Sequence, residues 1–165
     1  MPGDCKQGWP YSNSLEMGLL CAAVGGVVGV WLALTAGGAG YFAFVTAAPV
    51  ATLLSGTFWW WLLIVRTDCQ HRFPAVMAGM LAAVSGHILC WYFLMLGTFI
   101  WSAAGKLTTF GPVMNPLQAL PATVLYGALS LYFFGWITIP TGALLGGLLA
   151  TVQARRRRTP ASTGS

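Results

Sequence analysis

Four long runs in which almost every residue is apolar restrict the fold of this chain more than any other feature. A helix that crosses a bilayer needs about 20 mostly apolar residues to span a hydrocarbon core of about 30 Å. The runs cover about residues 15–36, 42–65, 74–101 and 122–152. They predict an all-α, polytopic membrane protein whose four transmembrane helices form a bundle.

The composition supports this class of protein. Only 7% of the 165 residues are charged and 57% are hydrophobic, whereas soluble domains carry about 25% charged residues. A soluble fold of this chain would lack polar side chains to cover its surface. We therefore expect one helical domain over residues 12–152, between flexible ends at 1–11 and 153–165.

The basic residues predict the orientation, because Lys and Arg near the ends of spans favour the cytoplasm. With four spans, both chain ends and the 66–72 loop lie on one side of the membrane. That side holds seven of the eight basic residues, namely Lys6, Arg66, Arg72, Arg155, Arg156, Arg157 and Arg158, and Lys106 lies on the other. We expect both termini in the cytoplasm, with the bacterial inner (plasma) membrane as the location.

The run Arg155 to Arg158 has a further consequence. Clustered arginines next to a span are attracted to anionic lipid headgroups. No aromatic residues are interleaved with them, so the pattern does not predict nucleic-acid binding. Membrane lipids are the expected partner of this tail.

Residues 58–66, FWWWLLIVR, end the second run with three consecutive tryptophans. Indole rings favour the headgroup level of a bilayer, and an arginine just beyond them can extend to the interface. We expect Trp59, Trp60, Trp61 and Arg66 to anchor the helix in the lipid. The alternative is an aromatic platform for a ligand.

Small residues recur four positions apart in three of the runs. Gly25 and Gly29 form such a pair in the first run, Gly79 lies between Ala75 and Ala83 in the third, and Gly142 and Gly146 pair in the fourth. Such faces let helix backbones approach closely in lipid. They predict tight packing within the chain, between copies, or with another membrane protein.

Two polar signals precede long helices. Asn13 and Glu16 have the spacing of a capping box at the start of the first run. Asn115 followed by Pro116 is typical of an N-cap and the first helical residue, with Gln118 completing a second capping box.

Charged chemistry is absent from the middle of the runs, where no Asp, Glu, Lys or Arg occurs. Proton-coupled carriers and most membrane hydrolases need such residues. The sequence therefore predicts no catalytic residue and no cofactor. Asp68, Cys69 and His71 in the loop supply fewer ligands than a closed zinc site needs, so no metal site is predicted there.

His87, in the stretch SGHILCW, is the one ionisable side chain deep in a run that invites a functional hypothesis. Helical spacing places Met80, His87 and Cys90 near one face, and these soft ligands suit copper, while an imidazole alone can bind haem. We treat the three as ligand or pathway candidates. The alternative is a structural hydrogen bond to Ser or Thr hydroxyls, or to carbonyls near Pro49 or Pro140.

Three classes of function remain open. The first is a non-enzymatic protein that binds another integral membrane protein, or itself, as an accessory subunit, assembly factor or immunity-type protein. The second is an oligomeric pore or small-solute transporter with His87 on the path. The third is a metal- or haem-dependent redox membrane protein.

The orientation generates a testable prediction. Cys5 and Cys69 should react with an impermeant thiol reagent only after the cytoplasmic face of the membrane is opened. Cys5 lies before the first span and Cys69 in the 66–72 loop, both on the side that holds most of the basic residues. Mass spectrometry of labelled peptides from intact and opened cells measures this. Labelling of either residue in intact cells would reverse the orientation.

Overall fold

A computed structural model describes residues 12–36, 39–67, 72–106 and 113–158. Four helices in these residues are long and apolar enough to cross a membrane, which confirms an all-helical chain with four candidate spans. They are α1 (Ser12–Thr35), α2 (Ala43–Trp60), α3 (Arg72–Ala103) and α4 (Pro116–Arg158). A short 3-10 helix, η1 (Ala39–Phe42), precedes α2, and a π-helix, η2 (Trp61–Val65), continues it.

Helix α4 is longer at both ends than the fourth apolar run. Its 43 residues begin at Pro116, where the Asn115 side-chain oxygen accepts a hydrogen bond of 3.2 Å from the Leu117 backbone N–H. This confirms the predicted cap. At the other end the helix includes residues 153–158, which we expected to be flexible. Arginine is a good helix former, so the basic run extends the helix instead of ending it.

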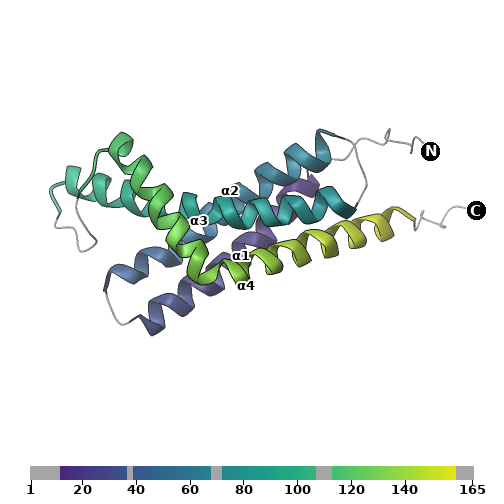
Figure 1. Cartoon of the computed structure of the whole chain (residues 1–165), viewed down its shortest axis with the longest axis horizontal. Coiled ribbons are helices and arrows are strands. Elements are labelled where there is room, and N and C mark those ends of the chain that lie inside the picture. Colours follow the sequence, from purple (N-terminus) through teal and green to yellow (C-terminus); the bar gives the residue numbers. More distant parts are fainter. Residues whose placement is uncertain (1–11, 37–38, 68–71, 107–112, 159–165) are drawn as a thin grey trace, which may run out of the picture.

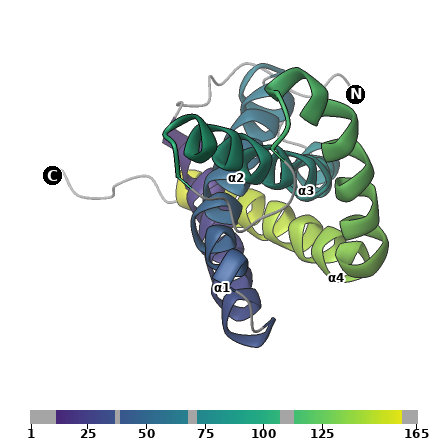
Figure 2. The same cartoon turned by 90° about the vertical axis from the view of Figure 1, so that its left-hand side faces the viewer.

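The helices pack in chain order: α1 lies along α2, α2 along α3, and α3 along α4. Helices α1 and α4 meet near the start of α1 and the end of α4, which we call the closed end of the bundle (Figure 1). Toward the opposite, open end, the α1–α2 hairpin diverges from the α3–α4 hairpin, as Figures 1 and 2 show. The arrangement is thus a splayed bundle.

Glycines bring α1 directly against the backbone of α2. A Cβ atom at Gly29 would lie 2.6 Å from the carbonyl oxygen of Phe44, and one at Gly25 would lie 2.9 Å from that of Ala48. Real Cβ atoms do not approach oxygen so closely, so a larger residue here would push the helices apart.

The same device joins α3 and α4. A Cβ atom at Gly79 would overlap the carbonyl oxygen of Gly142, one at Gly142 would overlap that of Gly79, and one at Gly146 would overlap that of Ala75. All five glycines that the sequence marked for helix packing therefore pack within the chain itself.

Larger side chains fill the bundle at its two ends. At the closed end, Met17, Trp60, Ile64 and Leu149 pack together over the small residues of α3. Near the open end, Phe44 meets Trp91 edge to face, and Trp91 stacks on Tyr126 with ring centroids 5.0 Å apart. Side-chain packing thus joins all four helices at the closed end. Near the open end it joins α2, α3 and α4.

The close contact of α3 with α4 predicts unequal effects of two glycine changes. Gly79→Ala should destabilise the protein by about 1–3 kcal/mol, because the new methyl group overlaps the α4 backbone. Gly97→Ala should be neutral or stabilising by up to about 1 kcal/mol, because alanine favours helix and nothing lies within 4 Å of its Cβ position. Denaturant unfolding in detergent micelles measures both. Equal stability of the two variants would contradict this packing.

Candidate functional site

The imidazole of His87 lies between α3 and α4 and has a partner for each nitrogen. Nδ1 is 2.8 Å from the Ser130 hydroxyl oxygen, and Nε2 is 3.0 Å from that of Thr138. A neutral imidazole has one donor and one acceptor nitrogen, and a hydroxyl can take either role. Both nitrogens are therefore satisfied within the chain.

The two hydroxyls come from positions eight residues apart on one helix. In a straight α-helix these positions are about 12 Å apart along the axis. Side chains on a helix lean in the same direction, so leaning does not close this gap. One imidazole with two hydrogen bonds spans at most roughly 8 Å. Helix α4 must therefore bend around His87.

The packing of α4 on α3 shows the same bend. On one side of it Gly146 meets Ala75 and Gly142 meets Gly79, so each four-residue step on α4 matches four residues on α3. On the other side Gly127 meets Ile88. Gly127 and Gly142 are fifteen residues apart on α4, whereas their contacts on α3, Ile88 and Gly79, are only nine residues apart. The extra residues form the bend that is visible in Figure 1.

We call residues 131–137 the α4 elbow, the part before it (Pro116–Ser130) the outer arm and the part after it the inner arm. Pro140 lacks a backbone N–H, which removes a helical hydrogen bond to residue 136 and favours a kink just before it. Gly135 is buried within the elbow, and the atoms nearest to its Cβ position belong to the side chains of Leu131 and Ile139 on α4 itself. Large side chains are exposed around the elbow, namely Tyr132, Phe133, Phe134, Trp136 and Ile137.

The Ser130–His87 pair also has the form of a nucleophile next to a base. Acyl transfer needs in addition a group that orients the base and free N–H donors for the developing oxyanion. Here the second nitrogen of His87 meets the Thr138 hydroxyl instead of a carboxylate. Backbone N–H groups near Ser130 belong to a continuous helix, where they bond to carbonyls four residues earlier. What the geometry shows is a bridge from α3 to two positions on α4.

The other two candidates on α3 have different surroundings. Cys90 packs against the open-end cluster of Phe44, Ala47 and Leu94 on α2 and α3, whereas His87 faces α4. Met80 is half-buried, seven residues before His87. Within the part of the chain that the structure describes, no three His, Cys, Asp or Glu side chains gather as a metal site would need. The loop residues Asp68, Cys69 and His71 lie outside that part.

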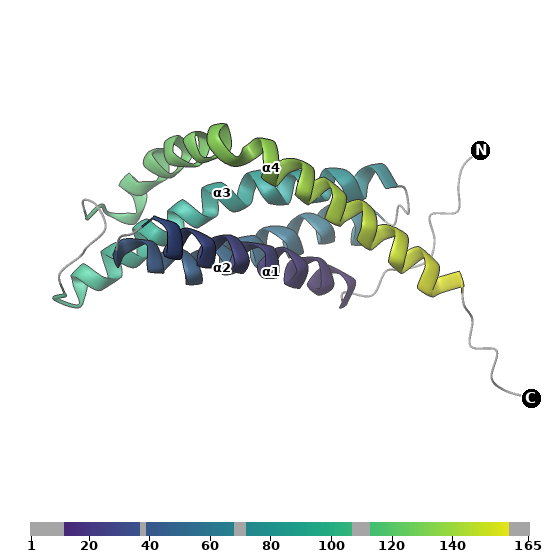
Figure 3. The ribbon, with the colours of Figure 1, turned by 90° about the horizontal axis from the view of Figure 1, so that it is seen from below.

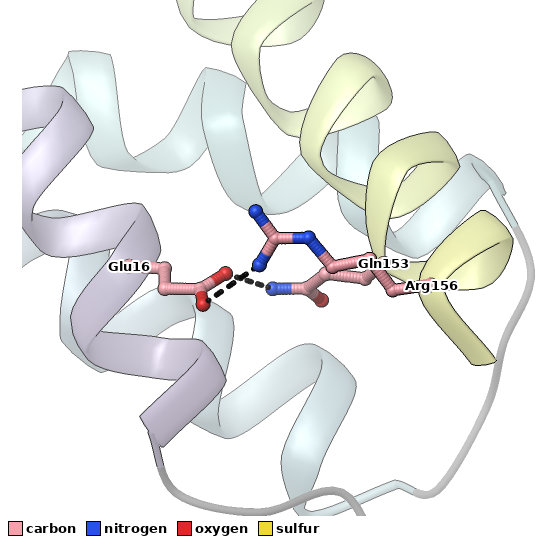
Figure 4. Close-up of polar contacts among 3 residues, drawn as sticks. All are labelled: Glu16, Gln153 and Arg156. Carbon is pink, nitrogen blue, oxygen red and sulfur yellow. Dashed lines mark hydrogen bonds and ion pairs between the residues drawn. The ribbon is translucent and has the colours of Figure 1, made fainter. Parts of the chain in front are cut away.

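A second polar site closes the bundle between α1 and α4 (Figure 4). The Glu16 carboxylate accepts a hydrogen bond of 3.1 Å from the Gln153 amide nitrogen and one of 3.3 Å from Arg156, which is also an ion pair. Gln153 is only 4% exposed, while Glu16 and Arg156 reach the surface. The sequence suggested that Glu16 caps its own helix; in the structure its carboxylate bonds to α4.

The tryptophans lie differently from the expected lipid anchor. Trp60 is fully buried in the closed-end core, and Trp59 is half-buried and donates a hydrogen bond of 3.0 Å from its indole nitrogen to the Ser85 hydroxyl. These two rings face α1 and α3 because consecutive residues on a helix point in different directions, and α2 has neighbours on two sides. Trp61 is half-buried and Arg66 exposed, and their anchoring role stays a prediction.

Sequence reasoning named Ser or Thr hydroxyls in general as partners of His87, but it singled out neither Ser130 nor Thr138, nor Gln153 at the second site. Single polar residues in an apolar helix were the available signal, since a polar group in lipid needs a partner. Their partners lie 43 and 137 residues away in the chain. Such pairings require knowledge of how α4 lies on the other helices.

No protein-family model matches the chain, and neither curated proteins nor solved structures show a significant match to it. The argument for its function therefore rests on its own residues.

The closed-end site predicts that its two charged residues differ in importance. Glu16→Ala should destabilise the protein by about 1–3 kcal/mol, because it leaves the buried amide nitrogen of Gln153 without this partner. Arg156→Ala should cost less than about 1 kcal/mol, because the ion pair is exposed to solvent. Unfolding of both variants in detergent tests the order. A larger loss for Arg156→Ala would show that charge attraction dominates the site.

Proposed function

We propose that the protein acts without catalysis by binding a transmembrane helix of another integral membrane protein, as an accessory subunit, assembly factor or immunity-type protein. The proposal includes the bacterial inner membrane and the orientation with both termini in the cytoplasm, which the distribution of basic residues supports. The observation that carries it is an uncovered apolar face of α1.

This face continues the side of α1 that meets α4 at the closed end. Helical spacing places Leu20, Ala23, Val27 and Leu34 in line with Glu16. In a closed four-helix bundle they would pack against α4. Here α4 leaves α1 beyond Glu16, and Val27 and Leu34 are 70% and 76% exposed. We call this line of residues the α1–α4 seam.

The seam has the properties of a helix-binding surface. It is apolar along its length, and both sides are helices that diverge toward the open end (Figure 3). Gly26 lies beside it with nothing within 4 Å of its Cβ position, which lets another backbone approach. Helices associate in lipid through such close packing. The five glycines named above already serve contacts within the chain, whereas Gly26 does not, and it borders the seam.

A matched pair of substitutions tests the proposal. Val27→Trp places an indole in the seam, whereas Val28→Trp adds the same bulk about 100° around the helix. After purification in a mild detergent from the native host, we expect a stoichiometric membrane partner with the wild-type chain and with Val28→Trp. Val27→Trp should retain about tenfold less of it, a change of about 1.4 kcal/mol.

A photo-crosslinking amino acid at position 27 identifies what occupies the seam in the membrane. Crosslinks to one other membrane protein support the proposal. Crosslinks to lipid alone overturn it, as does equal retention of the partner by the two tryptophan variants. Crosslinks between two copies of this chain would also overturn it and favour the oligomeric pore.

A further inference from the structure

We propose that His87 is a latch that fixes the angle between the two arms of α4, and that the outer arm swings about the elbow when the imidazole is released. This inference does not depend on the proposed function. It rests on the position of His87, on the way each arm packs, and on the composition of the elbow.

The imidazole joins both arms to α3 at one point. Ser130 is the last residue of the outer arm and Thr138 lies at the start of the inner arm, and each places its hydroxyl on a different nitrogen of the same ring. Because the ring is rigid, the two hydrogen bonds together set the distance between these hydroxyls. Loss of either bond removes that restraint.

The arms are separate packing units. The inner arm is held by the interlocked backbones at Gly79 and Gly142 and again at Gly146, where an added Cβ atom would overlap the backbone of the other helix. The outer arm contacts α3 at Gly127, which meets Ile88, and at Tyr126, which stacks on Trp91.

The outer arm has one buried side, where Ala119 and Thr123 are each only 1% exposed, and a broad exposed apolar side. Leu117 is 76% exposed, Leu125 is 61% exposed and Val124 is 56% exposed. The hydrogen bond between His87 and Ser130 is a direct polar tie of the outer arm to α3, one turn from the contact of Gly127 with Ile88.

The elbow is built to allow the movement. Pro140, just after the elbow, removes the helical hydrogen bond to residue 136, and Gly135 within the elbow carries no side chain that would restrict its backbone. Helix hinges are commonly formed by a few such positions that absorb the change in backbone angles. Released from His87, the outer arm keeps its helical hydrogen bonds and changes only its direction.

The test measures the distance between the arms directly. Spin labels are placed at Leu125 on the outer arm and Leu144 on the inner arm, both more than half exposed, in a full-length chain whose four native cysteines are replaced. Pulsed electron paramagnetic resonance in liposomes should give one narrow distance distribution. His87→Ala should shift or broaden it beyond the wild-type width.

Two gentler variants keep the test decisive where His87→Ala does not fold. Ser130→Ala frees the outer arm from the ring and Thr138→Val frees the inner arm with almost no change of shape, so each should broaden the distribution. Ser85→Ala is the matched control. It removes a hydroxyl from α3, the helix of His87, but the partner of that hydroxyl is Trp59 on α2 instead of a residue of α4. It should leave the distribution unchanged.

A purely structural hydrogen bond predicts a different result. In that case the variants lower the free energy of unfolding but keep the wild-type distance distribution. Unchanged distances in both Ser130→Ala and Thr138→Val overturn the latch. Broadening in Ser85→Ala to the same extent also overturns it, because the effect would then follow from any loss of a polar contact on α3.

Discussion

The close approach of helix backbones at small residues is the interaction on which this structure depends. Lipid tails are as apolar as leucine, so helices in a bilayer gain little from burying large apolar side chains against one another. They gain from van der Waals contact, which requires that backbones come close. The row of small residues on α3 provides this contact, with Gly86 toward α2 and Gly79 toward α4. The order of the helices in space follows from it.

The bend of α4 is the second determinant, and it follows from length. A straight helix of 43 residues would be about 64 Å long, twice the thickness of a hydrocarbon core of about 30 Å. Pro140 and Gly135 let the helix change direction, and the glycines of each arm hold it on α3. His87 lies between the arms, and hydroxyls of the bent helix bond to both of its nitrogens. The imidazole thereby avoids the free-energy cost of burying an unpaired polar group, and it ties both arms to α3.

The bend of α4 and the divergence of the two hairpins together determine which helix surfaces no neighbouring helix covers. Polar side chains at His87, Trp59 and Glu16 bond to neighbouring helices within the chain, and the packing glycines face inward. What is left outward is apolar, and along the seam it borders two diverging helices. The exposed surface along the seam is therefore apolar and bordered by helices, and this is the physical basis of the binding role that we propose.

The sequence by itself determined the all-helical fold, the four spans, the cap at Asn115 and the glycines that pack. These follow from local properties: the length of an apolar run, the preferences of Asn and Pro at a helix start, and the need of close backbones for glycine. The tertiary structure decided the rest. It turned Trp60 into the core instead of toward lipid, gave Glu16 a partner on α4, and placed Ser130 and Thr138 on the two sides of His87. The reason is that helical periodicity defines the faces of each helix, whereas the neighbour that each face meets depends on crossing angles and on a bend, which arise only when all four helices pack together.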